Sequence, residues 1–147
     1  ALALSPMCVT TGWPILLVGR DHIPAETQAV LADPDFRFRV VGGGPATVSD
    51  AVLDELGEGD RVSNRLWGDD RYETAVAIME DARAGMSPVL NAANTGVVAR
   101  LPDALTGGSA LGLRQGCLVL TGTDRLPSVS RRFLHDHTRE IDALALH

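Results

Sequence analysis

The chain has 147 residues, of which 45% are hydrophobic and only 4% aromatic, so its apolar surface suffices for a core of Leu, Val, Ile and Ala. This composition excludes a disordered chain. The formal net charge is −6, and the 13 basic residues are all Arg, which argues against a general nucleic-acid-binding protein because such proteins present a basic face.

Short apolar runs alternate with longer segments of helical periodicity along the whole chain. We expect strands at Pro14–Val18, Arg37–Val41, Arg61–Leu66, Pro88–Ala93, Cys117–Thr121 and Ile141–Leu146. We expect helices near Leu2–Thr11, Pro24–Ala32, Val48–Leu56, Asp70–Ala84, Pro102–Leu113 and Pro127–Thr138. Short strands separated by longer helices are typical of βαβ units, so the predicted fold class is α/β with a parallel sheet flanked by helices. No apolar run reaches the ~18–20 residues that span a membrane, and we expect no membrane insertion.

An internal repeat organises the sequence. A shift of 103 residues places Ile15-Leu16-Leu17 on Leu118-Val119-Leu120, and the match continues without a gap from Asp21 on Asp124 to Asp33 on Asp136. One repeat is therefore about a hundred residues long. We expect residues 1–66 to be the C-terminal part of one repeat and residues 67–147 the N-terminal part of the next, in a piece of a longer tandem array.

Several phrases then carry a family resemblance. Residues 65–75 read Arg-Leu-Trp-Gly-Asp-Asp-Arg-Tyr-Glu-Thr-Ala, and Asn94-Thr95-Gly96 and Pro102-Asp103-Ala104-Leu105 follow. Pro14-Ile15-Leu16-Leu17 and the segment from Gly43 to Ser49 stand in the first repeat. In this order the phrases resemble the cell wall-binding repeat type 2 (CWB2) modules of Gram-positive surface proteins.

The resemblance implies a fold, a function and partners. It implies a Rossmann-like or Toprim-like α/β module that occurs in about three tandem copies packed as a pseudo-trimer. Such modules attach S-layer proteins, autolysins or adhesins to anionic wall polymers, either teichoic-acid-like or another secondary wall polymer. The expected protein is extracellular, at the cell wall, with neighbouring repeats as partners and homo-oligomers allowed. We expect no catalysis and no cofactor in this segment.

The phrase from Asp70 offers the first candidate contacts for a polymer. Asp70, Arg71 and Glu73 open a helix, and the planar guanidinium of Arg71 suits a phosphodiester or a uronate. The alternative is a structural ion pair or helix cap, because most charges at helix starts act locally.

Strand-end loops offer further candidates. Asn94 and Asp103 are expected to flank a loop at the C-terminal end of a strand, where ligands of α/β sheets bind, although an Asn turn and an acidic first helical turn explain them as well. Arg20 and Arg125 follow the two equivalent apolar strands, either as anion contacts at the rim or as solvated charges.

Other features are expected to be structural. Gly42-Gly43-Gly44 lacks a nucleotide-binding spacing and is expected to form a tight turn, with Ser49 at a helix entrance. His135 and His137 are two apart on a helix and do not face one another, so we expect no metal there. Cys8 and Cys117 are expected to be buried free thiols. Two rival functions stay open: a small-molecule or phosphate-handling α/β enzyme using the Asn94–Asp103 loop, and a purely structural repeat that packs its neighbours.

Overall fold

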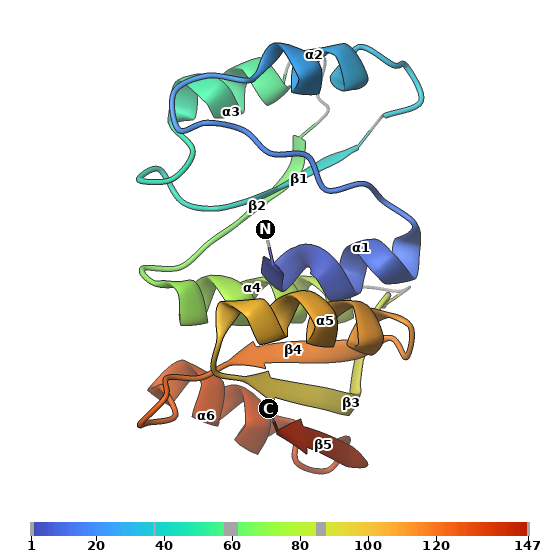
Figure 1. The fold of residues 1–147 in the computed structure, drawn as a ribbon, viewed down its shortest axis with the longest axis vertical. Helices are drawn as coiled ribbons and strands as arrows, with labels where there is room; N and C mark the ends of the chain where they lie inside the picture. Colours follow the sequence, from blue (N-terminus) through green and yellow to red (C-terminus); the bar gives the residue numbers. More distant parts are fainter. Residues whose placement is uncertain (1, 37, 58–61, 85–87, 147) are drawn as a thin grey trace. The chain divides into compact units, whose positions relative to one another are not determined.

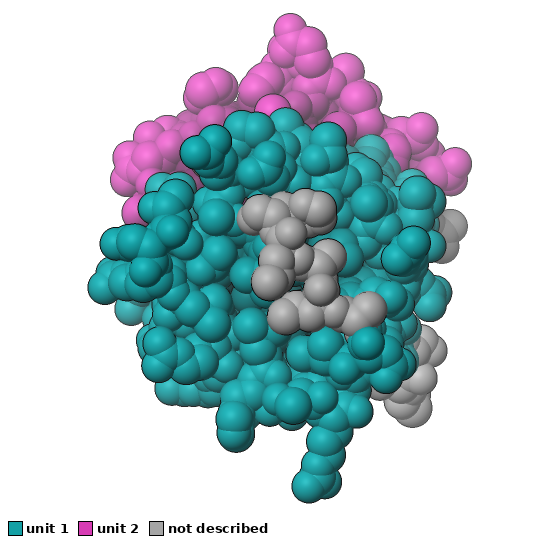
Figure 2. All heavy atoms as spheres, turned by 60° about the horizontal axis from the view of Figure 1, so that its bottom comes forward, with its two compact units in different colours: residues 1–15, 68–147 teal, residues 16–67 magenta. Residues whose placement is uncertain are grey.

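The computed structural model describes residues 2–36, 38–57, 62–84 and 88–146, and it divides into two compact units. Unit 1 comprises residues 1–15 and 68–147, and unit 2 comprises residues 16–67, as coloured in Figure 2. Helices and parallel strands make up both units, so the predicted α/β class with parallel sheets is confirmed. The division into repeats at residues 66 and 67 stays a prediction.

Unit 1 is built on a three-stranded parallel sheet (Figure 1). Its strands are β3 (Asn91–Val98), β4 (Gly116–Leu120) and β5 (Ala143–Leu146), in the order β4-β3-β5. Helix α5 (Leu101–Gly112) joins β3 to β4, and α6 (Ser128–Asp136) joins β4 to β5. Because these crossovers run in opposite directions and right-handed crossovers are the rule, α5 and α6 cover opposite faces of the sheet. Helix α4 (Arg71–Arg83) packs on β4 and contacts α6.

The N-terminal helices also belong to unit 1. The short 3-10 helix η1 (Leu2–Leu4) leads into α1 (Ser5–Thr11), and both pack against α5. Two glycines of α5 permit a close approach. A Cβ on Gly108 would lie 2.9 Å from the Cβ of Ser5, and one on Gly112 would lie 2.7 Å from the carbonyl oxygen of Pro6. The small residues therefore bring the backbones of the two helices together.

Unit 2 contains a two-stranded parallel sheet of β1 (Arg39–Gly42) and β2 (Val62–Leu66). Helix α2 (Ala25–Leu31) precedes β1, and α3 (Asp50–Gly57) joins the two strands. The core consists of Ile23, Val41, Val48, Val52 and Leu56. Arg37 and Arg61, the first residues of two predicted strands, lie outside the described residues.

A largely buried arginine holds the turn between β1 and α3. The side chain of Arg65 is only 13% exposed; its Nε donates to the Gly43 carbonyl at 3.0 Å and its guanidinium also donates to the Val48 carbonyl. Its Nη1 pairs with Asp50 at 2.7 Å. Gly43 has a φ of 138°, which requires glycine, and its N–H donates to Leu66 at 2.9 Å. The glycine run thus forms a turn that hydrogen bonds hold in place, as predicted.

Two local predictions were wrong. Pro14–Val18 forms no strand, although its repeat equivalent is β4. Asn94-Thr95-Gly96 forms no turn but lies inside β3, which runs on to Val98. Gly96 serves close packing instead, because a Cβ there would lie 2.5 Å from the Leu111 side chain of α5. Glycine inside a strand commonly marks such an approach.

Candidate functional site

The C-terminal edge of the sheet in unit 1 is the candidate site. β3 and β4 end there, at Val98 and Leu120, and helices α4, α5 and α6 begin on the same side, at the left of Figure 1. Parallel α/β sheets bind ligands at this edge, because loops and helix N-termini with free N–H groups gather there.

The start of α4 is a fully built helix cap. The Asp70 carboxylate accepts hydrogen bonds from the N–H groups of Tyr72 and Glu73, both at 2.8 Å. Glu73 reaches back and accepts from the Asp69 N–H at 2.9 Å, and the Thr74 hydroxyl accepts from Gly68 at 3.1 Å. Asp70 and Glu73 therefore act as capping groups, which is the structural alternative that the sequence left open.

Three arginines of this edge stay exposed. Arg71 is the first residue of α4, Arg100 is the N-cap residue of α5, and Arg125 lies in the loop between β4 and α6. Within the described ranges, no hydrogen bond or ion pair engages their guanidinium groups. Arg100 was missed by the sequence reasoning, although its place between a strand end and Pro102 marks it as a strand-end residue. The three groups are free to donate to an external anion.

The other two predicted contact residues of this site, Asn94 and Asp103, lie apart. Asp103 lies in the first turn of α5 and Asp124 beside Arg125, so the edge carries both signs of charge. Asn94 pairs with Ala143 well before the end of β3. Four residues of strand, roughly 13 Å, separate it from Val98. The structure therefore does not bring Asn94 and Asp103 together.

The corresponding loop of unit 2 repeats the geometry of the Arg125 loop. The Gly19 N–H donates to the His22 carbonyl at 2.9 Å, and its repeat equivalent Gly122 donates to Arg125 at 3.1 Å. Arg20 lies in this loop, 62% exposed, and pairs with Asp21 at 3.0 Å. Arg20 is thus an exposed rim residue of unit 2 with a neighbouring carboxylate.

Comparison with known proteins identifies the family. The profile of cell wall binding domain 2 (CWB2) matches residues 65–145. The chain belongs to this family. It is 28% identical over 134 residues to the N-acetylmuramoyl-L-alanine amidase LytC of Bacillus subtilis (strain 168). The aligned region covers 91% of the chain and 25% of LytC. Cwp6 from Clostridium difficile has the same fold, with a TM-score of 0.77 and 24% identity over 92% of the chain and 21% of Cwp6.

The family match describes a cell wall-binding module. The chain spans about a quarter of the length of LytC and a fifth of Cwp6, so the amidase activity in the name of LytC belongs to a protein about four times longer. In the described part of the chain, no helix combines the length and apolar character needed to cross a membrane.

The N-terminal edge of the sheet in this CWB2 module carries a cluster of charges. Arg83 at the end of α4 pairs with Glu140 at 2.7 Å, and His137 has its Nδ1 3.2 Å from Glu140 and its Nε2 3.1 Å from Glu80. Hydrogen bonds from His137 and Arg83 hold the pKa of Glu140 below its ordinary value. The cluster ties α4 to the segment that follows α6 and lies away from the exposed arginines.

The histidines and cysteines have structural surroundings. The side chain of His135 is 85% exposed, whereas that of His137 is 14% exposed and packs on Phe133 with ring centroids 4.7 Å apart. The two rings thus point in different directions, as predicted. Cys8 and Cys117 are free and buried, also as predicted. Burial raises the pKa of the Cys117 thiol to about 12.

Proposed function

We propose that this module attaches a secreted surface protein to the bacterial wall through an anionic wall polymer, teichoic-acid-like or another secondary polymer. The family match over residues 65–145 carries the proposal. The polymer contacts would be Arg71, Arg100 and Arg125 at the C-terminal edge of unit 1, with Arg20 at the rim of unit 2. We also retain the Rossmann-like or Toprim-like fold type as part of the proposal.

Exposed arginines are suited to this contact. Their planar groups donate two parallel hydrogen bonds to a phosphate or carboxylate. The chain has a net charge of −6 and acidic residues stand among these arginines, so long-range attraction to a polyanion is absent. Binding therefore depends on short-range donors, and Asp103 adds an acceptor for sugar hydroxyls. Asn94 lies too far along β3 to share that subsite.

Weak contacts of this kind become useful when they are repeated. Each rim contributes only a few exposed donors, but several rims tethered in one protein engage one polymer at a high effective concentration. The rim geometry shared by the Gly19 and Gly122 loops supports such repetition. Neighbouring repeats, and further copies of the chain, are then the natural protein partners.

The rival functions make different demands. The enzyme hypothesis needs Asn94 and Asp103 in one loop, and the structure separates them. The residues with clearly shifted pKa at the sheet, Cys117 and Glu140, lie at its other edge, among the structural charges. The purely structural hypothesis predicts that removing exposed arginines leaves wall binding unchanged, so one experiment separates it from polymer binding.

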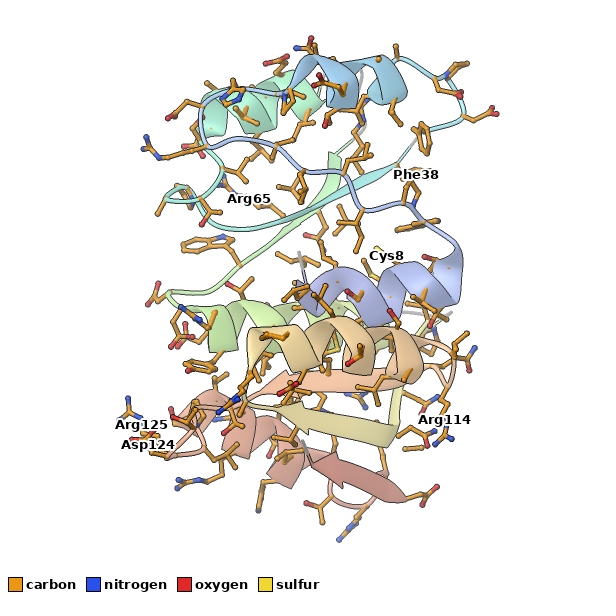
Figure 3. The ribbon with its side chains drawn as sticks, viewed as in Figure 1. Cys8, Phe38, Arg65, Arg114, Asp124 and Arg125 are labelled. Atoms are coloured by element: carbon orange, nitrogen blue, oxygen red, sulfur yellow. The ribbon has the colours of Figure 1, made fainter. Side chains whose placement is uncertain are left out.

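The test is co-sedimentation of the chain with isolated Gram-positive cell walls, intact and after removal of their anionic polymers. Replacing both Arg71 and Arg125 with Ala should weaken binding to intact walls roughly a hundredfold, since each hydrogen bond to a charged group contributes about 1.5 kcal/mol or more and two arginines are removed. The matched control is Arg114→Ala. Arg114 is also exposed and lies at the opposite end of the strands (Figure 3).

The outcomes are distinct. Equal binding to stripped and intact walls would refute the anionic polymer as partner. Equal loss in the R71A/R125A variant and in R114A would refute the C-terminal edge as the contact site and leave a general charge effect. Repeating the assay with Ca²⁺ and with EDTA shows whether a cation bridges Asp103 or Asp124 to the polymer.

A further inference from the structure

Helix α6 and the residues that flank it carry a concentration of positive charge. Residues 125–139 contain four of the 13 arginines of the chain and a single carboxylate, that of Asp136. We call these four arginines the basic row: Arg125, Arg131, Arg132 and Arg139. The chain as a whole has 19 acidic residues and a net charge of −6. The basic row is therefore a local exception in an acidic protein.

The packing of α6 turns two of these arginines toward solvent. Ser130 and Phe133 are 0% and 2% exposed, and the side chain of His137, further along the same side, is 14% exposed. These positions recur at the spacing of one helix face. That face attaches α6 to β4 and α4. Arg131 and Arg132 are exposed and lie on the outer side of the helix.

The guanidinium groups of the basic row lack partners within the protein. Among the residues that the structure describes, no hydrogen bond or ion pair engages any of the four. The carboxylate of Asp136 lies 3.1 Å from Nδ1 of His135 instead. Arg83 of α4 shows the contrasting case, because Glu80 and Glu140 both pair with it. The basic row is therefore open to an external anion.

The equivalent helix of unit 2 has no such row. The shift of 103 residues places α2 on α6 and puts uncharged or weakly basic residues at the four positions: His22, Gln28, Ala29 and Phe36. The buried contact of the helix is nevertheless kept. Ser130 donates to the carbonyl of Leu120 at 2.6 Å, and its equivalent Thr27 donates to that of Leu17 at 2.8 Å. Packing of this helix therefore does not require arginine at these positions, which points to a ligand.

We propose that the basic row binds a linear, densely charged phosphodiester polymer, which continues along α6 from the C-terminal edge of the sheet. Arg125 belongs to both surfaces, because it lies in the loop that leads from this edge into α6 (Figure 3). Planar guanidinium groups are suited to phosphate oxygens. This inference rests on the proposed function and extends its contact site.

The spacing of the basic row indicates the class of polymer. α6 has nine residues and is about 13 Å long, with Arg125 before it and Arg139 after it. Four groups over this length lie roughly 5 Å apart, so a ligand needs a charge in every short repeat unit to pair with each of them. A polyol phosphate meets this condition, whereas a polysaccharide with sparse charges engages one group at a time. No apolar side chain of α6 is exposed, so the helix is not suited to insertion into a lipid surface.

The test compares poly(glycerol phosphate) with hyaluronan, which has one carboxylate per disaccharide, by isothermal titration calorimetry at equal total charge. The chain should bind poly(glycerol phosphate) more tightly. The variant Arg131→Gln/Arg132→Gln should lose about tenfold or more in affinity for it, since two ion pairs are removed, and should lose the preference as well. Glutamine and arginine have similar helix propensities, so α6 should stay intact. The matched control, Ala29→Glu/Arg114→Gln, changes the net charge equally but outside the basic row, and should bind like the unchanged chain.

Several results would overturn the proposal. These are equal binding of the two polyanions, unchanged affinity in R131Q/R132Q, and an equal loss in this variant and in its control, which would be a general charge effect. If R131Q/R132Q binds intact walls normally while R71A/R125A does not, the proposed function stands and only the basic row is wrong. If the unchanged chain binds neither poly(glycerol phosphate) nor intact walls, both fail. Binding to phosphatidylglycerol vesicles that R131Q/R132Q abolishes, without binding of poly(glycerol phosphate), would identify a lipid surface instead and refute the polymer.

Discussion

Neighbouring glycines in α5 allow the packing of α1 to be tested by a single pair of substitutions. Gly107 and Gly108 lie in the interior of the same helix. A Cβ on Gly107 would lie 3.7 Å from the Val98 side chain, an ordinary contact. A Cβ on Gly108 would lie 2.9 Å from the Cβ of Ser5, which cannot move without moving α1. Alanine at both positions thus offers equal helix propensity in unequal space.

The magnitudes follow from these distances. Replacing Gly by Ala inside a helix raises the free energy of unfolding by about 0.8–1 kcal/mol through helix propensity, so Gly107→Ala should stabilise unit 1 by roughly that amount. Gly108→Ala gains the same propensity but forces α1 away by about 1 Å, and overpacking of this kind costs typically 1–3 kcal/mol. The two variants should therefore differ by about 1–3 kcal/mol. At about 2–4 °C per kcal/mol for a chain of this size, Tm should differ by roughly 3–10 °C.

Thermal unfolding followed by circular dichroism measures this difference. The double variant Ser5→Gly/Gly108→Ala removes the opposing Cβ and should recover most of the loss, as a non-additive pair. If Gly108→Ala stabilises the chain as much as Gly107→Ala, the close approach of α1 and α5 does not exist in solution. If Gly108→Ala lowers the stability and the double variant does not restore it, the steric clash involves an atom other than the Cβ of Ser5.

Three further predictions concern the Asp70 cap of α4, the hydroxyl of Ser130 and the thiol of Cys117. Asp70→Ala should lower the free energy of unfolding by about 1 kcal/mol through loss of the α4 cap, with Asp69→Ala as a near-neutral control in urea unfolding. Ser130→Ala removes a buried hydrogen bond to Leu120 and should cost about 1–3 kcal/mol in the same assay; no change would contradict the geometry. Folded Cys117, with a pKa of about 12, keeps its proton where the unfolded thiol ionises, so stability should be complete below about pH 9 and fall between pH 9 and 12. Cys117→Ser should lessen this fall, and alkylation of Cys117 at pH 8 should require unfolding, since its thiolate fraction is about a thousandfold below that of an ordinary thiol.

The sequence predicted best those elements whose pattern is local. Helix α4 could be predicted because its buried residues, Ala75, Ile78, Met79 and Ala82, recur at helical spacing after a capping Asp. β4 could be predicted as a short apolar run, and all of its residues are buried. In both cases, the information lies within a dozen residues.

The failures concern partners that lie far away in the sequence. Residues 14–18 have the composition of β4, but a strand needs a neighbouring strand to bond with, and none of the described strands pairs with this segment. Asn94-Thr95-Gly96 has the composition of a turn, but Gly96 is there because Leu111 packs over it. Composition alone does not distinguish a glycine that bends the chain from one that admits a neighbour.

The arginines show the same limit at the candidate site. Arg65 and Arg71 stand six residues apart in the phrase of residues 65–75, yet the Arg65 side chain is 13% exposed and bonded to two carbonyls and Asp50, whereas Arg71 is exposed. Arg83 is also 13% exposed and paired with Glu140. Charges held inside in this way contribute little to an outer surface, so the count of 13 arginines overstates the positive charge that a wall polymer meets. In the function proposed above, a polyanion would therefore not be drawn to this module from a distance, and its retention would come from hydrogen bonds made at close range by a few exposed guanidinium groups and multiplied by repetition.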